Sequence, residues 1–178
     1  MKRRIYELMR RMKLIGLADG VLLIHNIFKN YDVNKQFRRS HTNIAIPPYR
    51  LAYDAYGSCN FLDFYNSGQQ FAIKLDEIIR KYTNKRLTIC EWGCGPARIL
   101  PHFLTIDNGI EELIGTDYNE ETINWCKEKY PSINFICNKL TPPWNFLLIP
   151  LMFYFASLSS RTYQKLNIMP GVMKLSGC

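Results

Sequence analysis

Apolar residues recur at helical spacing between Gln69 and Tyr82, ahead of three short apolar runs. In this segment the apolar positions are Phe71, Ala72, Leu75, Ile78 and Ile79. Their spacing places them on one face of a helix. The pattern therefore predicts an amphipathic helix that leads into the first apolar run.

The three apolar runs lie at residues 87–91, 112–117 and 133–137, and each has the length of a strand. Strand-like and helix-like patterns alternate between residues 86 and 137. Such alternation is typical of parallel strands joined by crossover helices. The fold class that we expect is therefore α/β, with a helical extension at the N-terminal end.

A glycine turn follows the first run. Gly93 and Gly95 carry no Cβ, so a ligand can approach the backbone closely there. The N–H groups of the helix that follows are expected to face this ligand. The first run ends in Glu91 and the second in Asp117, which comes 22 residues after Gly95. This is close to the ~20 residues at which an acid reaches a ribose hydroxyl in dinucleotide folds. The features predict half of a site for a cofactor that contains a nucleoside.

The loop chemistry separates the classes of cofactor. A dinucleotide fingerprint has a third glycine where Arg98 stands, which weakens an NAD or FAD interpretation. No G-K-[ST] follows, so a Walker loop is excluded. An acid two residues before Gly93 suits a ligand with an ammonium group rather than a phosphate. The structural alternative is a helix-capping glycine loop beside a solvated aspartate.

Two segments carry a family resemblance. Residues 91–98, Glu-Trp-Gly-Cys-Gly-Pro-Ala-Arg, resemble motif I of the class I S-adenosylmethionine-dependent methyltransferases, and residues 115–119 resemble their acidic motif on the second strand. The resemblance runs from about Leu87 to Trp144. It implies a Rossmann-like sheet, S-adenosyl-L-methionine as cofactor, and methyl transfer to an unknown acceptor as the parent function.

The resemblance implies roles for the residues of the first motif and for the second acid. Glu91 would orient the loop and the methionine amine. Gly93, Cys94 and Gly95 would form the loop beside the methionine, with the glycines making room for it. Asp117 would accept hydrogen bonds from the ribose hydroxyls.

Four further positions belong to the same resemblance. Tyr118 would pack near the adenine, and Asn138 is a candidate for the adenine edge. Arg98 suits a carboxylate contact or a structural ion pair, and both roles stay open. Pro96 departs from the usual glycine but is tolerable at a first helical position, where no N–H is needed. The catalytic residues stay unknown, because a general base is expected from segments beyond the resemblance.

The net charge of +8 is concentrated near the N-terminus. Six basic residues fall within the first thirteen positions, and an apolar helical face lies between them. Residues 1–15 therefore suit weak peripheral contact with an anionic membrane, or a docking helix with a solvated basic side. A charge this local argues against a nucleic-acid partner. Asp19 and His25 interrupt the apolar stretch, so no signal peptide is expected and the location is cytoplasmic.

Six cysteines are present, without a C-x-x-C pair. Cys90 and Cys94 flank a strand end and its turn, which is poor geometry for zinc. We therefore expect buried thiols in a reducing compartment and no metal site.

The predicted organisation has three parts. Residues 1–85 form a helical extension or lid, with Tyr53, Tyr56 and Tyr65 as possible aromatic cover, and residues 86–144 form a partial S-adenosylmethionine-binding domain. Residues 145–178 lack both strand alternation and a helical stripe. We expect this tail to be out of frame, and we expect the chain as written to be truncated after the third strand and inactive.

Codon degeneracy motivates the frame hypothesis. Joining the third base of each codon to the first two bases of the next converts Met152-Phe153 to Val and Phe153-Tyr154 to Leu. Residues 149–165 are then compatible with S-F-D-V-L-F-C-I-S-V-F-T-H-L-S-E, which resembles the fourth strand and next helix of these methyltransferases. The frame would slip near residues 144–148. A divergent tail in frame is the alternative, and the functional alternative is a non-enzymatic remnant or a small binding module with a basic N-terminal helix.

Overall fold

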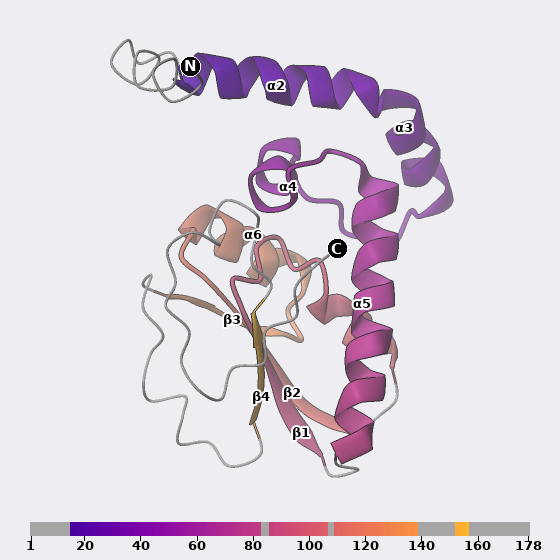
Figure 1. Cartoon of the computed structure of the whole chain (residues 1–178), viewed down its shortest axis with the longest axis vertical. Helices are drawn as coiled ribbons and strands as arrows, with labels where there is room; N and C mark the ends of the chain where they lie inside the picture. The colour runs from indigo at the N-terminus through magenta and orange to yellow at the C-terminus, as the bar shows by residue number, and fades with distance from the viewer. Residues whose placement is uncertain (1–14, 83–85, 107–108, 139–151, 157–178) are drawn as a thin grey trace, which may run out of the picture. The chain divides into compact units, whose positions relative to one another are not determined.

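The computed structural model describes residues 15–82, 86–106, 109–138 and 152–156 (Figure 1). The chain divides into two compact units, Met1–Leu62 and Asp63–Cys178. No helix within the described ranges is long and apolar enough to cross a membrane.

The first unit is helical, as predicted for its described part, and contains α2 (Ile15–Lys29), α3 (Tyr31–Ser40) and α4 (Tyr49–Tyr56). Buried asparagines hold its connecting segment in place. The Asn34 side chain donates to the carbonyl oxygen of Cys59 (2.7 Å) and accepts the N–H of Phe61 (2.9 Å). The side-chain oxygen (Oδ1) of Asn26 accepts the N–H of Cys59 (2.6 Å). These bonds satisfy polar groups that would otherwise be buried without partners.

The second unit contains a parallel sheet in the order β3-β2-β1-β4. Its strands are β1 (Leu87–Trp92), β2 (Ile110–Asp117), β3 (Asn134–Cys137) and β4 (Met152–Ala156). The first three strands confirm the α/β prediction and coincide with the three apolar runs. In this order β2 lies between β1 and β3, and β4 lies on the other side of β1. This is the strand order of a Rossmann-like sheet.

Strand β4 is an addition to the sequence prediction. It lies within residues 145–178, where neither alternation nor a helical stripe was found, and pairs with β1 from Thr88↔Met152 to Trp92↔Ala156. A continuous apolar run has no period, so periodicity alone does not distinguish a strand from a helix there. Strand β1 therefore pairs with β2 on one side and with β4 on the other.

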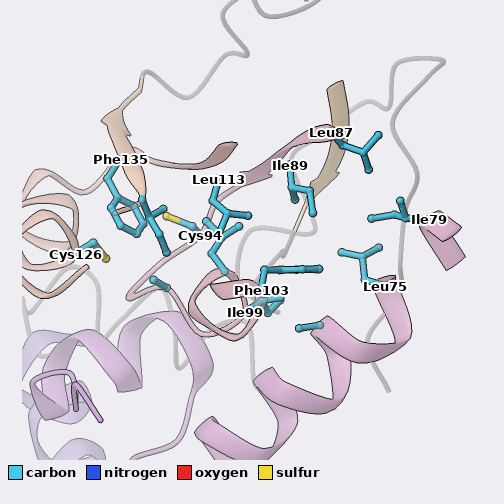
Figure 2. Close-up of a cluster of buried hydrophobic side chains, with 14 of the residues drawn as sticks. Leu75, Ile79, Leu87, Ile89, Cys94, Ile99, Phe103, Leu113, Cys126 and Phe135 are labelled. Carbon is cyan, nitrogen blue, oxygen red and sulfur yellow. The ribbon is translucent and has the colours of Figure 1, made fainter. Parts of the chain in front are cut away.

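The core of this unit lies on one face of the sheet, against α5 (Phe61–Tyr82), η1 (Leu100–Thr105) and α6 (Glu120–Lys129). Figure 2 shows Leu75 and Ile79 of α5 beside the β1 side chains, and Phe135 beside Cys126 of α6. The predicted amphipathic helix before the first strand is confirmed as part of α5, because Ala72, Leu75 and Ile79 are buried.

A glycine in β2 makes the packing of Phe135 possible. A Cβ on Gly115 would lie 2.6 Å from the Phe135 ring and 3.0 Å from the Leu100 side chain. Both separations are shorter than carbon–carbon contact allows. Gly115 therefore lets an aromatic side chain and η1 lie directly on the sheet.

The helix after the glycine turn differs from the prediction. It is the short 3₁₀ helix η1, which begins at Leu100 rather than at Pro96. Two residues explain the difference: Ala97 has φ +52°, and Pro101 stands in the first turn of η1. A left-handed residue interrupts a right-handed helix, and proline has no N–H to bond four residues back. Pro96 therefore lies in the turn and is not a first helical residue.

Candidate functional site: the carboxyl ends of β1 and β2

The two motifs meet because β1 and β2 are parallel neighbours. Their register pairs Glu91 with Gly115 and Trp92 with Thr116, so both strands end at the same edge of the sheet. Ligands of open α/β sheets bind at this carboxyl edge. The structure thus brings the glycine loop after β1 and the acid at the end of β2 together.

Asp117 connects the two motifs directly. It is 8% exposed, and its Oδ2 accepts the N–H of Gly95 at 2.9 Å. Its Oδ1 accepts the N–H of Asn119, also at 2.9 Å. A carboxylate has about four acceptor positions. Asp117 is therefore fixed by the backbone and keeps acceptor capacity for hydroxyl groups of a ligand.

The N–H groups of the glycine loop bond to this chain. Those of Gly93 and Cys94 both donate to the carbonyl oxygen of Thr116, at 2.7 and 2.9 Å, and that of Ala97 donates to Cys94 at 3.1 Å. The N–H groups of Gly93, Cys94 and Ala97 therefore have acceptors within the chain. The expectation that the first N–H groups of the following helix face a ligand stays a prediction. A phosphate site needs several N–H groups aimed at the anion. The loop therefore lacks the donor arrangement of a pyrophosphate site.

Positive φ angles shape this loop. Gly93 has φ +73° and Gly95 has φ +52°, where glycine is favoured, but Ala97 also has φ +52°. An alanine in the left-handed region carries strain of about 1–2 kcal/mol. The sequence gives no sign of the left-handed conformation at Ala97, because alanine ordinarily prefers a helix.

Glu91 lies on the core face of β1 and is fully buried. Its partner in the register of β2 is Gly115, over which the Phe135 ring and the Leu100 side chain pack. The charge of Glu91, after burial itself, contributes to raising the pKa of the neighbouring Cys94 thiol well above its usual value. A buried carboxylate at the base of the loop favours a cationic ligand group.

The cysteines at the loop are neutral thiols that bind their own chain. Cys94 and Cys126 both donate to the carbonyl oxygen of Gly95, at 3.5 and 3.4 Å. Burial, with Asp117 and Glu91 nearby, raises the pKa of Cys126 to about 12. The prediction of buried thiols is confirmed at Cys59, Cys90, Cys94 and Cys126 and is wrong for Cys137, which is exposed at the end of β3. The Cys126 thiol therefore connects α6 to the loop, while the Cys94 thiol bonds within the loop.

Arg98 contacts helix α5. Its Nη1 donates to the Ser67 hydroxyl at 3.1 Å, and a Cβ on Gly68 would overlap the Arg98 carbonyl oxygen. The structure therefore gives Arg98 a packing and hydrogen-bonding role with α5, and the proposed carboxylate contact stays a prediction. The sequence does not show that a glycine is needed at position 68, because a single glycine in a helical pattern gives no information on the segment that packs against it.

A histidine and a tyrosine complete this contact. His102 of η1 meets the Tyr65 ring of α5 edge-on, with 4.8 Å between ring centroids. Burial, together with the Arg98 charge, lowers the pKa of His102. Tyr65 thus packs within the second unit. Tyr53 and Tyr56 belong to the first unit, so their suggested role as a lid stays a prediction.

Two further predicted site residues lie at the end of β2. Tyr118 follows Asp117 and is 63% exposed. The Asn138 N–H donates to the carbonyl oxygen of Asp117 at 2.9 Å, which places Asn138 beside the second motif. Its side-chain oxygen is buried and has no hydrogen-bond partner within the described part of the chain. That oxygen is a candidate acceptor for a ligand.

Comparisons with known proteins complete the description. No protein-family model and no curated protein matches this chain. Among solved structures it is similar to a TehB-like SAM-dependent methyltransferase from Corynebacterium glutamicum, with 23% identity over 41% of this chain and 35% of that one (TM-score 0.31). Streptomyces venezuelae DesVI has 16% identity over 58% and 40% (TM-score 0.39).

A third similar structure is the plantazolicin methyltransferase BpumL, in complex with a pentazolic desmethylPZN analog and SAH. It has 19% identity to this chain, over 65% of this chain and 45% of that one (TM-score 0.37). The chain therefore spans less than half the length of each of these three structures.

Proposed function

We propose that this chain carries the S-adenosylmethionine-binding half of a methyltransferase, with an unidentified methyl acceptor. The hydrogen bond from Gly95 to Asp117 carries the proposal, because it joins the glycine loop and the ribose-binding candidate at one sheet edge. In this proposal the ribose hydroxyls donate to the remaining acceptor positions of Asp117.

The loop chemistry supports this cofactor over a dinucleotide. S-adenosylmethionine carries an ammonium group, a carboxylate and a sulfonium, but no phosphate. The inward N–H groups of Gly93 and Cys94 suit such a ligand, because no pyrophosphate has to be held. The buried Glu91 carboxylate at the base of the loop provides an electrostatic partner for the ammonium group.

The adenine side is the less constrained part of the proposal. Tyr118 offers an exposed ring for packing against adenine, and the Asn138 side-chain oxygen offers an acceptor for the adenine amino group. We assign no role in the cofactor site to the Arg98 side chain beyond its contact with α5.

The bound cofactor would supply a methyl group on a positively charged sulfur, which makes the sulfur a good leaving group. This chain's residues would bind and orient the donor for in-line displacement, which is the main contribution such a protein makes. No described residue is proposed as a general base. The cytoplasmic location stays part of the proposal and agrees with the free thiols.

Titration calorimetry with S-adenosylhomocysteine tests the proposal. We expect Asp117→Asn to weaken binding by about tenfold or more. The substitution removes the negative charge and replaces one of the two acceptor oxygens by an NH₂ donor. Glu112→Gln is the matched control, since Glu112 lies on the same strand but is exposed and bonds to Asn134. The control should bind like the wild type.

Three outcomes would contradict the proposal. They are an unchanged affinity in Asp117→Asn, tighter binding of NAD than of S-adenosylhomocysteine, and absence of binding by a wild-type sample that unfolds cooperatively. The last outcome would favour a non-enzymatic remnant or binding module.

A further inference from the structure

Helix α2 exposes a continuous row of apolar side chains. Leu17, Val21, Ile24 and Phe28 follow one another at steps of four, three and four residues, and Tyr31 continues the row at the start of α3. Each is between 54% and 74% exposed. This spacing places Leu17, Val21, Ile24 and Phe28 on one side of α2, and Tyr31 continues the spacing into α3. We call these five residues the α2 stripe.

The other side of α2 is already occupied within the first unit. The Asn26 side chain accepts the N–H of Cys59 at 2.6 Å, and the Asn30 side chain donates to the carbonyl oxygen of Asn26 at 2.8 Å. Helix α2 also packs against α4. The α2 stripe is therefore turned away from the helix's own packing partners. A contiguous exposed apolar row of this kind marks an interaction site.

The charge of the chain is concentrated around the α2 stripe. The first 40 residues contain ten Lys and Arg residues and three Asp and Glu residues, a net charge of +7 out of +8 for the whole chain. Basic residues flank the stripe on both sides, from Lys2 to Lys13 and from Lys29 to Arg39. At the α3 end of the stripe, the Lys35 ammonium lies 5.7 Å from the centre of the Tyr31 ring.

This charge distribution discriminates among the partners that could cover the α2 stripe. A second copy of the helix would bring like charges together in either orientation, because both flanks are basic. A nucleic acid would neutralise the charge but leave the apolar row exposed. An anionic bilayer satisfies both features, since its headgroups attract Lys and Arg and its acyl boundary accepts apolar side chains.

We propose that the α2 stripe docks on an anionic membrane surface, with α2 lying in the plane of the interface. Leu17, Val21, Ile24 and Phe28 enter the acyl boundary, while the flanking basic side chains reach the headgroups. Tyr31 and Lys35 lie at headgroup depth, where an aromatic ring and a long cation are both favoured. The inference is independent of the proposed cofactor site, which lies in the second unit.

Vesicle co-sedimentation of the full chain tests this surface. The vesicles contain phosphatidylglycerol and phosphatidylcholine, or phosphatidylcholine alone. We expect binding to the anionic vesicles, weakened by salt, and a loss of about tenfold or more in the double variant Val21→Gln/Phe28→Gln. The matched control is Ile73→Gln/Leu104→Gln, which removes two exposed apolar side chains elsewhere and should bind like the wild type.

A second measurement reports insertion at one position. In Phe28→Trp, fluorescence should be quenched by brominated lipid more strongly than in Leu104→Trp, because only the first tryptophan enters the acyl boundary. Equal quenching in the two variants would overturn the proposal, even if the double variant were unfolded.

Other results that overturn it are equal binding to both kinds of vesicle and binding to neither. A lipid-free dimer that disappears in Val21→Gln/Phe28→Gln would assign the stripe to a second copy instead. Binding to duplex DNA with no binding to vesicles would assign the charge to a nucleic acid.

Discussion

Helices α5 and α2 are both rich in apolar residues, but they use them differently. Helix α5 directs Leu75 and Ile79 into the core under the sheet, with each about 1% exposed (Figure 2). Helix α2 leaves Leu17 and Phe28 largely exposed. The amphipathic pattern of α5 is therefore accounted for by folding of the described chain. The pattern of α2 is not, and this difference is what makes its exposed stripe informative.

The largest expected difference concerns one leucine from each helix. Leu75→Ala should lower the free energy of unfolding by about 2–5 kcal/mol, because it leaves a cavity in the core. Leu17→Ala should change the free energy of unfolding by less than about 0.5 kcal/mol, because the exposed Leu17 side chain buries little apolar surface when the chain folds. Urea denaturation of both variants measures this contrast. Equal effects would show that α2 buries Leu17 in solution.

The next largest contrast is between alanine substitutions of one glycine in each helix. Gly68→Ala should destabilise the chain by about 1–3 kcal/mol, because its Cβ would overlap the Arg98 carbonyl oxygen. Gly20→Ala in α2 has nothing within 4 Å of the new Cβ and should stabilise by up to about 1 kcal/mol. The two alanines are therefore expected to shift the melting temperature in opposite directions.

Gly68→Ala should also affect the proposed site. Displacement of the Arg98 backbone moves the turn that follows Gly95, so affinity for S-adenosylhomocysteine should fall together with stability. Gly20→Ala should leave that affinity unchanged. A destabilised Gly68→Ala variant with full affinity would show that the α5 contact does not position the loop.

The pH dependence of stability gives a third contrast. Burial and the Arg98 charge lower the pKa of His102 in the folded state. At pH values between this lowered pKa and the ordinary value of 6.5, the unfolded chain therefore binds more protons than the folded chain. The free energy of unfolding should therefore fall as the pH decreases through 6.5 and level off below the folded pKa. His102→Gln should remove this part of the pH dependence, whereas His25→Gln in α2 should retain it. Denaturation at several pH values provides the measurement.

The parts of the fold that depend on local sequence pattern could be predicted. Three strands, the helix before them and the meeting of Gly95 with Asp117 were predictable, because apolar periodicity and parallel connection order determine them. Strand β4 was missed, since a continuous apolar run has no period. The 3₁₀ geometry of η1 was missed because it depends on Ala97 and Pro101 together.

The contacts of the site were harder to predict than its position. Which acceptor each loop N–H finds depends on the Thr116 carbonyl, and the need for glycine at position 68 depends on the Arg98 backbone. Both are tertiary contacts between segments far apart in the chain. Exposure of the α2 stripe is likewise a property of packing, since the sequence shows only that the residues are apolar.

The smallest expected effect compares two alanines. Ala97→Gly should stabilise the chain by about 0.5–1 kcal/mol, because glycine relieves the cost of φ +52° while losing some entropy on folding. Ala18→Gly in α2 should destabilise by about 1 kcal/mol, as glycine does inside a helix. Thermal unfolding of both variants measures the opposite signs. If Ala97→Gly destabilised the chain as much as Ala18→Gly, the loop in solution would not hold Ala97 in the left-handed region. The turn between Gly95 and η1 would then differ from the one that positions Arg98 against α5.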